Sequence, residues 1–361
     1  MKILVTGCGG SAAQNFVAAL RLVDPLRTFT IVGLDASPHR LAVADADARY
    51  LAPSTTDEPG AWLDLVAHLA RDCDLIHPQP DGDVALLTAH AERFAGKLAL
   101  PPRDVVALCQ DKMDTAEVLA KAGVPVPESA SAHRLEDFLD RYGGGQVWLR
   151  AIRGAGTLGA LRPASRLEAA RWISQCVDTR GIPVDGWMVA EYLPGREYAC
   201  QQLWWHGQLV GTFLRERLEC LFGFLSPTGR SSTPALARTL PADHPAEYTA
   251  LEAVRAVAGP TPHGVFGVDL REDAAGLAKV TEINAGRFFT TSLFSAQAGV
   301  NLPAAYVRCH AGAAVAALPA APPDLFWVRV PDRPPLLLHS SQLTGGERFR
   351  TVRVEHETAT P

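Results

Sequence analysis

The sequence predicts an α/β protein that begins with a Rossmann-like domain and continues into a mixed α+β region. Through the first hundred residues, short apolar runs typical of strands alternate with amphipathic stretches typical of helices, which indicates a parallel sheet covered by helices. The first apolar run, residues 2–6, ends in a glycine-rich turn. At Pro101 and Pro102 the pattern changes to helices followed by paired strands, and 361 residues suffice for two or three domains.

Hydrophobic periodicity places the elements of the first domain. Residues 2–6 are rich in β-forming side chains, and Phe16, Ala19, Leu20 and Val23 then recur at the spacing of one helix face. The predicted elements, in order, are strand 2–6, helix 12–22, strand 29–34, helix 61–69, strand 75–76, helix 84–94 and strand 98–100.

Turn residues divide the second region. Gly123 ends a predicted helix, Pro194 and Gly195 predict a turn between antiparallel strands, and an Asp/Gly-rich turn at 273–276 predicts a hairpin. The predicted helices are 104–109, 112–122 and 166–177. The predicted strands are 146–150, 187–193, 197–203, 267–270 and 278–283, with 325–330 and 349–354 in a tail that is proline-rich after residue 319.

The composition excludes several classes of protein. The formal net charge of −5 is too small to suggest a nucleic-acid binder. The sequence contains no run of 18 or more apolar residues, so it predicts no membrane span. Its first residues lack the long apolar stretch of a signal peptide. The seven cysteines include no C-x-x-C pair, which argues against a zinc knuckle or a disulfide framework. We therefore expect a cytoplasmic protein that contacts neither nucleic acid nor membrane.

The first candidate site is the glycine-rich turn at residues 7–12, which separates the first strand from the first helix. Read as G-x-G-x-x-A, this turn lets the backbone approach a phosphate at the helix N-terminus, and Asp35 ends the next strand where a ribose-binding acid would lie. NAD or NADP binding is one interpretation. The other is a tight turn of any doubly wound domain, and this segment alone does not separate the two.

The second candidate site is a set of oxygen ligands on two neighbouring strands. Glu282 and Asn284 are two residues apart and so project from one face, and Asp269 lies opposite Glu282 if the hairpin turns at 273–276. Two carboxylates and an amide oxygen suit Mg²⁺ when nucleotide phosphates complete its shell. A solvated polar face is the alternative, but Arg287 follows this strand closely and favours a phosphate ligand.

Three further features suit a nucleotide. Arg150 precedes a glycine-rich loop, 153–159, whose backbone N–H groups could close on polyphosphate. Lys112 stands at a helix start, where the macrodipole disfavours a cation, and this hints at an anionic ligand. Residues 191–193 form a strand edge suited to an adenine, and Glu197 could accept from ribose hydroxyls. The alternatives are a plain β-hairpin turn with solvated arginines for the glycine-rich loop and an ordinary surface lysine for Lys112.

These features occur in an order that resembles the ATP-grasp superfamily, and above all its members similar to the carbamoyl-phosphate synthase large chain. The segments that carry the resemblance are Gln110-Asp-Lys112, Trp148-Leu-Arg150 before the glycine loop, Val189 through Glu197, Gly267-Val-Asp269 and Glu282-Ile-Asn284. The resemblance covers residues 1–310 and implies a two-subdomain ATP-grasp fold. Its expected units are a Rossmann-like pre-ATP-grasp domain (1–110), a small lid subdomain (111–188), a large subdomain with the metal site (189–318) and a C-terminal extension (319–361).

The resemblance also implies residue roles. The residues that would bind ATP are Lys112, Arg150, Gly154, Gly156, Thr157, Gly159, Glu191, Tyr192, Leu193 and Glu197. The ligands of Mg²⁺, or of Mn²⁺ in its place, would be Asp269, Glu282 and Asn284. The catalytic candidates are Arg287 and Arg215, and the substrate would contact Gly9, Gly10, Ser11, Arg217 and Arg230. Most such ligases have a lysine where Arg150 stands, whereas the carbamoyl-phosphate synthase-like members have arginine.

The implied activity is that of an ADP-forming carboxylate–amine ligase that works through an acyl phosphate on small-molecule substrates. In place of the usual Asn-Pro-Arg, this sequence has Asn284-Ala-Gly-Arg287, and it shows one ATP-grasp half, so carbamoyl phosphate is not the expected product. An NAD(P)-dependent oxidoreductase remains an alternative, although it leaves the metal strand unexplained. A non-catalytic nucleotide-binding protein is a second alternative, although all three predicted metal ligands, Asp269, Glu282 and Asn284, are oxygen donors. Whether the chain forms a homodimer is left open.

Overall fold

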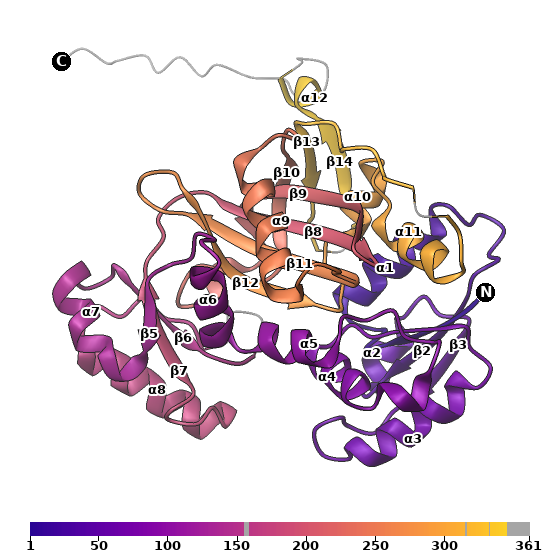
Figure 1. Cartoon of the computed structure of the whole chain (residues 1–361), viewed down its shortest axis with the longest axis horizontal. Coiled ribbons are helices and arrows are strands. Elements are labelled where there is room, and N and C mark those ends of the chain that lie inside the picture. The colour runs from indigo at the N-terminus through magenta and orange to yellow at the C-terminus, as the bar shows by residue number, and fades with distance from the viewer. Residues whose placement is uncertain (155–158, 315, 332, 345–361) are drawn as a thin grey trace, which may run out of the picture.

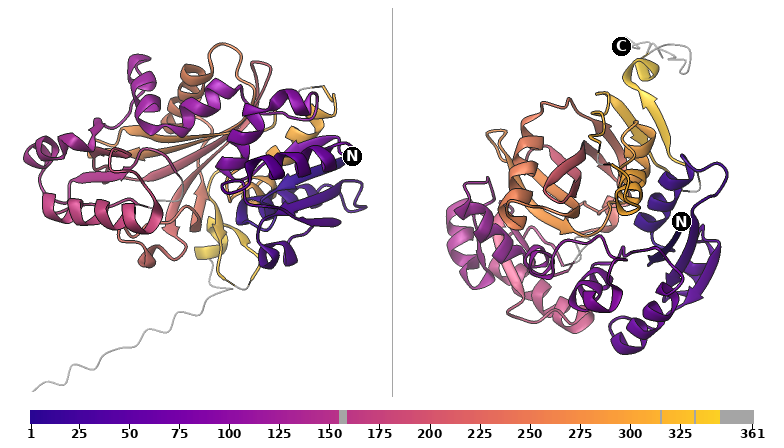
Figure 2. Two further views of the ribbon diagram at one scale, coloured as in Figure 1. Left: turned by 90° about the horizontal axis from the view of Figure 1, so that it is seen from below. Right: turned by 45° about the vertical axis from the view of Figure 1, so that its right-hand side comes forward.

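Three sheets organise the described part of the chain in the computed structural model, which describes residues 1–154, 159–314, 316–331 and 333–344. A four-stranded parallel sheet comes first, a three-stranded antiparallel sheet follows, and a seven-stranded antiparallel sheet occupies most of the second half. The parallel sheet and the three-stranded sheet lie at opposite ends of the molecule, each beside the seven-stranded sheet (Figure 1; Figure 2). The predicted α/β class with a Rossmann-like first domain is confirmed.

The parallel sheet has the strand order β3-β2-β1-β4. Its strands are β1 (Lys2–Thr6), β2 (Thr30–Asp35), β3 (Ala48–Leu51) and β4 (Leu75–His77). The helices of this part are α1 (Ser11–Arg21), α2 (Pro38–Ala42), α3 (Pro59–Ala70), α4 (Asp81–Ala89) and α5 (Arg103–Gln110). Two predictions need correction: strand 98–100 is a single bridge between Ile76 and Leu98, and helix 84–94 is α4 followed by the 3₁₀ turn Ala91–Phe94.

The three-stranded sheet has the order β5-β7-β6 and carries two helices. After α6 (Lys112–Lys121), its elements are β5 (Ser129–Ser131), α7 (Leu135–Tyr142), β6 (Val147–Ala151), α8 (Arg166–Arg180) and β7 (Trp187–Glu191). Phe138 of α7 and Cys176 of α8 pack with Trp187 of β7 in a core of their own. This unit is therefore held together by side chains that the other sheets do not share.

The seven-stranded sheet has the order β12-β11-β8-β9-β10-β13-β14. Its strands are β8 (Glu197–Trp205), β9 (Gln208–Cys220), β10 (Pro234–Thr239), β11 (Gly264–Glu272), β12 (Ala278–Ala285), β13 (Leu325–Val328) and β14 (Leu336–His339). Its helices are α9 (Pro245–Ala258), α10 (Ser292–Gln297), α11 (Leu302–His310) and α12 (Ser340–Thr344). The tail strand expected at 325–330 is β13, which pairs with β10, so the tail joins this sheet; the strand expected at 349–354 lies outside the described residues.

Both faces of the parallel sheet are buried, because alternate residues of each strand point to opposite faces. On one face Leu4 packs with Trp62 of α3. On the other face Ile3 packs with Phe16 of α1 in a core that continues into α10 and α11. The first domain thus shares a core with the second half of the chain. Among the described residues, no helix combines the length and apolarity that crossing a membrane requires.

The hairpin predicted around Pro194 and Gly195 is wrong, because the strands on either side belong to different sheets. β7 pairs with β5 and β6, whereas β8 pairs with β9 and β11. Pro194 has no N–H to donate to a ladder, and the Gly195 N–H donates to the Glu272 carbonyl oxygen at 3.0 Å. The chain crosses here from the three-stranded to the seven-stranded sheet, which leaves residues 191–193 at the junction of the two.

The length and burial of β9 were not evident from the sequence. Its second half, Leu214 to Cys220, is rich in charge. In the sequence, residues 215–233 indicate a segment that borders the substrate cleft and whose arginines suit a carboxylate, with a solvated charged loop as the alternative. In the structure Arg215 is 1% exposed and Arg217 is held by Glu197 of the neighbouring strand. Ion pairs between strands therefore replace the apolar alternation by which a buried strand is normally recognised.

We expect the crossing at Gly195 to be sensitive to one added methyl group. A β-carbon at Gly195 would lie 2.5 Å from the Glu272 β-carbon and 3.0 Å from its carbonyl oxygen, so Gly195→Ala should cost about 1–3 kcal/mol of stability. Gly60→Ala is the matched control, because no atom lies within 4 Å of the added carbon. Urea unfolding midpoints measure both; equal midpoints for Gly195→Ala and the wild type would contradict the close packing described here.

Candidate functional site

A cleft of about 890 Å³ lies between the three-stranded sheet and the β11–β12 hairpin, with α6 and the residues after β4 at its edge. Thirteen of the residues singled out in the sequence line it. They are Lys112, Arg150, Gly154, Glu191, Tyr192, Leu193, Glu197, Arg217, Arg230, Asp269, Glu282, Asn284 and Arg287. The fold thus brings into one cavity residues that are up to 175 positions apart in the chain, from Lys112 to Arg287.

The other candidates lie away from this cleft. Those that the structure describes but that do not line the cleft are Gly9, Gly10, Ser11, Gly159 and Arg215. The Arg215 side chain is buried, and its Nε donates to Thr291 Oγ1 at 2.9 Å. The Gly159 carbonyl oxygen accepts from Trp172 Nε1 at 2.8 Å. Gly156 and Thr157 lie outside the described residues.

The predicted oxygen ligands lie together on β11 and β12. Asp269 pairs with Glu282 across the two strands, as expected, and Asn284 Nδ2 donates to Asp269 Oδ2 at 3.1 Å. Burial raises the pKa of Asp269 to about 6, and the positive charge of Arg217 offsets only part of that rise. A further cation beside Asp269 would favour its ionised form.

The oxygen atoms of Asp269, Glu282 and Asn284 suit a hard divalent cation, but a bound molecule would have to supply further ligands. In the part of the chain that the structure describes, no three His, Cys, Asp or Glu side chains are grouped to hold a metal by themselves. A metal at Asp269 and Glu282 would therefore need the Asn284 amide oxygen and oxygen atoms of a bound molecule. Phosphate groups supply such oxygens.

Glu282 is held between two cations that come from different parts of the fold. Its carboxylate lies 2.6 Å from Arg150 Nη2 of β6 and 3.7 Å from Lys112 Nζ of α6. Burial alone would raise the pKa of Glu282, but the charges of Arg150 and Lys112 lower it overall. Lys112 Nζ also donates to the Gly154 carbonyl oxygen at 2.6 Å. These acceptors stabilise the cation at the start of α6. Asp111 caps the same helix, since its side chain accepts from the backbone N–H groups of Met113 and Asp114.

Arg287 connects the metal strand to the first domain. Its guanidinium contacts Asn284 Oδ1 and Asp81, with Nη2 lying 3.3 Å from Asp81 Oδ2. Gly286 permits this placement, because its φ is +86° and a β-carbon would lie 2.7 Å from Val84 Cγ1. Sequence reasoning missed Asp81; its position just beyond β4, at the carboxyl edge of a parallel sheet, was the available signal.

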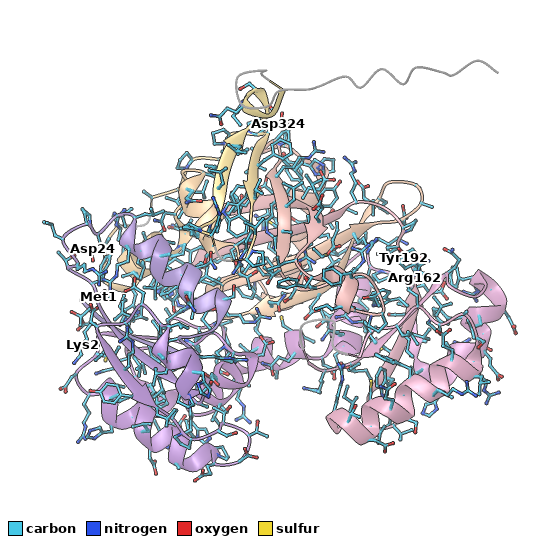
Figure 3. All side chains as sticks on the ribbon, turned by 180° about the vertical axis from the view of Figure 1, so that it is seen from behind. Met1, Lys2, Asp24, Arg162, Tyr192 and Asp324 are labelled. Atoms are coloured by element: carbon cyan, nitrogen blue, oxygen red, sulfur yellow. The ribbon has the colours of Figure 1, made fainter. Side chains whose placement is uncertain are left out.

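The junction between the two antiparallel sheets offers apolar and aromatic surface. Tyr192 lies beneath the Arg162 guanidinium, whose central carbon is 3.6 Å from the ring centroid, and Figure 3 shows the two residues side by side. Glu191 Oε1 accepts from Lys279 Nζ at 2.5 Å. The apolar residues that line this part of the cleft are Met188, Ala190, Leu193, Leu270, Val280 and Ile283. A flat aromatic ligand such as a purine suits this surface.

Glu197 is surrounded by arginines. Its carboxylate contacts Arg217 and Arg230, and Arg271 Nη1 lies 3.9 Å from Glu197 Oε2. Burial would raise the pKa of Glu197, but these three positive charges lower it. The sequence singled out Arg217 and Arg230 but missed Arg271, which stands directly opposite Glu197 in the β8–β11 ladder.

Comparison by sequence finds no relatives: no protein-family model and no curated protein matches the chain. Solved structures do match. N5-carboxyaminoimidazole synthetase from Staphylococcus aureus, complexed with ADP, has a TM-score of 0.67 at 16% identity over 91% of this chain and 82% of its own. A biotin carboxylase–β-γ-ATP complex from Campylobacter jejuni has a TM-score of 0.66 at 18% identity over 90% and 74%. L-amino acid ligase from Bacillus licheniformis has a TM-score of 0.64 at 14% identity over 90% and 78%.

Similarity of this extent, over nine-tenths of the chain, decides the fold. The chain has the ATP-grasp fold. The resemblance to the ATP-grasp superfamily that the order of motifs suggested is therefore confirmed at the level of the fold.

The ATP-grasp fold also accounts for the glycine-rich turn without a dinucleotide. The Gly9 N–H donates to Asp35 Oδ2 at 3.0 Å and the Ser37 N–H donates to Asp35 Oδ1 at 2.9 Å, so both carboxylate oxygens already hold the backbone. Asp35 is 6% exposed. Ser11 Oγ accepts from Arg329 Nη2 at 3.0 Å. The turn is fixed by these contacts, and its acid is poorly placed to receive a ribose.

We therefore expect no saturable binding of NADH or NADPH at micromolar concentration, measured by the fluorescence of the reduced nicotinamide. A ribose at Asp35 would have to displace two backbone donors from a buried carboxylate, which would leave them unsatisfied. Binding of ADP with Mg²⁺, measured by calorimetry on the same preparation, is the positive control. A saturating NADH signal that Asp35→Asn abolishes would restore the oxidoreductase alternative.

Proposed function

We propose that this chain is an ATP-dependent, ADP-forming ligase that joins a carboxylate to an amine through an acyl phosphate. The observation that carries the proposal is the position of Glu282 between Lys112 and Arg150, opposite Asp269 and on the same strand face as Asn284. A bound polyphosphate would take over the two cations. Glu282 would then be free to act with Asp269 and Asn284.

The residues that line the cleft favour one orientation of a bound nucleotide. The purine would lie at the junction near Tyr192, against the apolar surface that includes Met188 and Ile283. The ribose hydroxyls would donate to Glu197, and the phosphates would extend toward Lys112 and Arg150. One matched structure is an ADP complex and another is a β-γ-ATP complex, which supports a nucleotide in this cleft.

Mg²⁺ would be held by Asp269, Glu282 and Asn284 together with phosphate oxygens, since this set offers hard oxygen donors. When bound, it supplies positive charge that neutralises the β- and γ-phosphates.

The chain's own cations position the reacting groups. A carboxylate oxygen of the substrate attacks the γ-phosphorus, the bond from that phosphorus to the β–γ bridging oxygen breaks, and ADP leaves. Lys112 and Arg150 neutralise charge on the phosphates in this step, and Arg287, held by Asp81 and Asn284, is placed to orient the transferred group.

The acyl phosphate is then consumed by the amine. Nitrogen attacks the acyl carbon, the bond from that carbon to the phosphate oxygen breaks, and nitrogen releases a proton as the amide forms. No protein side chain becomes covalently attached. Exclusion of water by the glycine-rich loop would protect the intermediate from hydrolysis, which is the general advantage of a closing loop in such reactions.

Lys112→Ala should weaken binding of ATP with Mg²⁺ by about 10- to 100-fold, since a charge-assisted contact contributes about 1.5–3 kcal/mol. Isothermal calorimetry measures the affinity. Lys121→Ala is the matched control, because Lys121 ends the same helix and pairs at the surface with Glu117. Unchanged ATP affinity in a folded Lys112→Ala protein would exclude Lys112 from the phosphate site.

Glu282→Gln keeps the shape of the side chain and removes its charge. The protein should fold, bind ATP more weakly, and transfer the phosphoryl group about 100- to 1,000-fold more slowly, which corresponds to about 3–4 kcal/mol. ADP release, measured by a coupled assay across amino acids crossed with carboxylic acids, reports the step. The control is Glu252→Gln, which changes a surface carboxylate that pairs with Arg255.

The outcome that would refute the proposed function is ADP release at the wild-type rate by a well-folded Glu282→Gln protein. Binding of ATP without ADP release under any substrate pair would instead favour the non-catalytic alternative.

A further inference from the structure

Four arginines gather around two carboxylates on the side of the seven-stranded sheet that faces the cleft. We call this group the arginine cluster, and its members are Arg215, Arg217, Arg230, Arg271, Glu197 and Asp269. The strand registers place them in two rows. Glu197 stands opposite Arg217 and Arg271, and in the next row of this face Ala199 stands opposite Arg215 and Asp269.

The charges of the arginine cluster do not balance. Among the residues that the structure describes, the three strand arginines Arg215, Arg217 and Arg271 face two carboxylates, which leaves an excess of one positive charge on these strands. The next carboxylate beyond Asp269 is Glu282, which is already held by Arg150 and Lys112. Charges that are buried without compensation destabilise a fold strongly. Burial accordingly lowers the pKa of Arg215 to about 9, and the positive charge of Arg217 adds to the effect.

Hydrogen bonding in the cluster is also incomplete. Arg215 Nη1, Arg217 Nε and Arg271 Nε are buried, and none of the three has a hydrogen-bond acceptor among the residues that the structure describes. A buried donor left without an acceptor costs about 1–3 kcal/mol. Such donors are rarely left unpaired in proteins unless a ligand, an ion or water takes them. The cluster therefore lacks both negative charge and acceptor atoms.

A ligand in the cleft can reach this cluster. Arg217, Arg230 and Arg271 all line the cleft, and Ser232 and Thr290 line it beside them. Arg215 lies one layer deeper, where its guanidinium carbon is 5.5 Å from the centroid of the Phe289 ring. Phe289 itself lines the cleft. An anionic group would thus contact Arg217 and Arg230 directly, with the charge of Arg215 behind them.

We propose that the carboxylate substrate carries a second anionic group, a carboxylate or a phosphate, which binds at the arginine cluster while the first carboxylate is phosphorylated. This inference rests on the proposed ligase function. The nucleotide does not meet the need of the cluster, because its phosphates are matched by Lys112 and Arg150 and its ribose brings hydroxyl groups without charge. A second anionic group supplies both the missing charge and the missing acceptors.

The experiment compares acids of similar length that differ in one anionic group. The pairs are butanoate and succinate, pentanoate and glutarate, L-alanine and L-aspartate, and glycerate and 3-phosphoglycerate. With ATP, Mg²⁺ and a mixture of amino acids and ammonium as amine, kcat/KM for ADP release should be at least tenfold higher for the doubly anionic member of at least one pair. The phosphate pair separates a phosphate from a carboxylate as the second group.

A binding measurement accompanies the assay and does not depend on turnover. Calorimetric titration of each acid into protein saturated with ADP and Mg²⁺ should show the same preference. Arg230→Gln should reduce that preference at least tenfold, and Arg215→Lys, which keeps the charge, should retain more of it than Arg215→Met. Arg238→Gln is the control on the neighbouring strand, since Arg238 pairs with Glu216, which follows Arg215 in β9 and points to the other face.

The outcomes separate this inference from the proposed function. Equal kcat/KM and equal affinity within every pair would overturn the inference and leave the ligase function intact. Doubly anionic acids that bind preferentially at Arg230 without any ADP release would support the anion site and count against the ligase. Weaker ATP binding by Arg230→Gln, with an unchanged preference among acids, would assign Arg230 to the nucleotide and overturn the inference.

Discussion

The ion pairs of the half-buried Glu282 carboxylate are the contacts on which the arrangement of the cleft depends. Its two cationic partners come from α6 and from the three-stranded sheet, whereas Glu282 itself belongs to the seven-stranded sheet. One carboxylate therefore holds three parts of the fold in register. Removing one partner of such a group leaves a buried charge uncompensated, and this is far more costly than the pair itself is stabilising. The position of Glu282 is accordingly tightly constrained.

Other charged groups of the cleft are also paired with side chains of the protein itself. Arg287 is held by Asp81 and Asn284, and Glu197 is held by arginines, so the protein supplies its own counterions where ligands are proposed to bind. A polyphosphate or a carboxylate would replace those counterions instead of entering an unprepared cavity. This arrangement keeps the charged groups oriented before a ligand arrives, which would reduce the reorganisation that the proposed phosphoryl transfer requires.

The first domain contributes to the cleft through the position of Asp81, whereas its glycine-rich turn does not line the cleft. Its parallel sheet shares a core with α10 and α11, and this places Asp81, just beyond β4, against Arg287. The turn itself is closed by Asp35 and lies away from the cleft. A glycine pattern that is typical of dinucleotide binding here serves the geometry of a strand-to-helix connection. The pattern was informative about the fold.

Sequence patterns predicted the parallel first domain, the β11–β12 hairpin and thirteen of the residues that line the cleft. Each follows from information that is local in the chain: the spacing of apolar residues, turn residues, and the two-residue period that places Glu282 and Asn284 on one face. The tertiary structure was needed to show that β7 and β8 belong to different sheets, that Arg215 and Glu216 of β9 are buried despite their charges, and that Asp81 and Arg271 line the cleft. Those outcomes depend on partners that are distant in sequence. A buried arginine and an exposed one look the same until the opposing carboxylate is known.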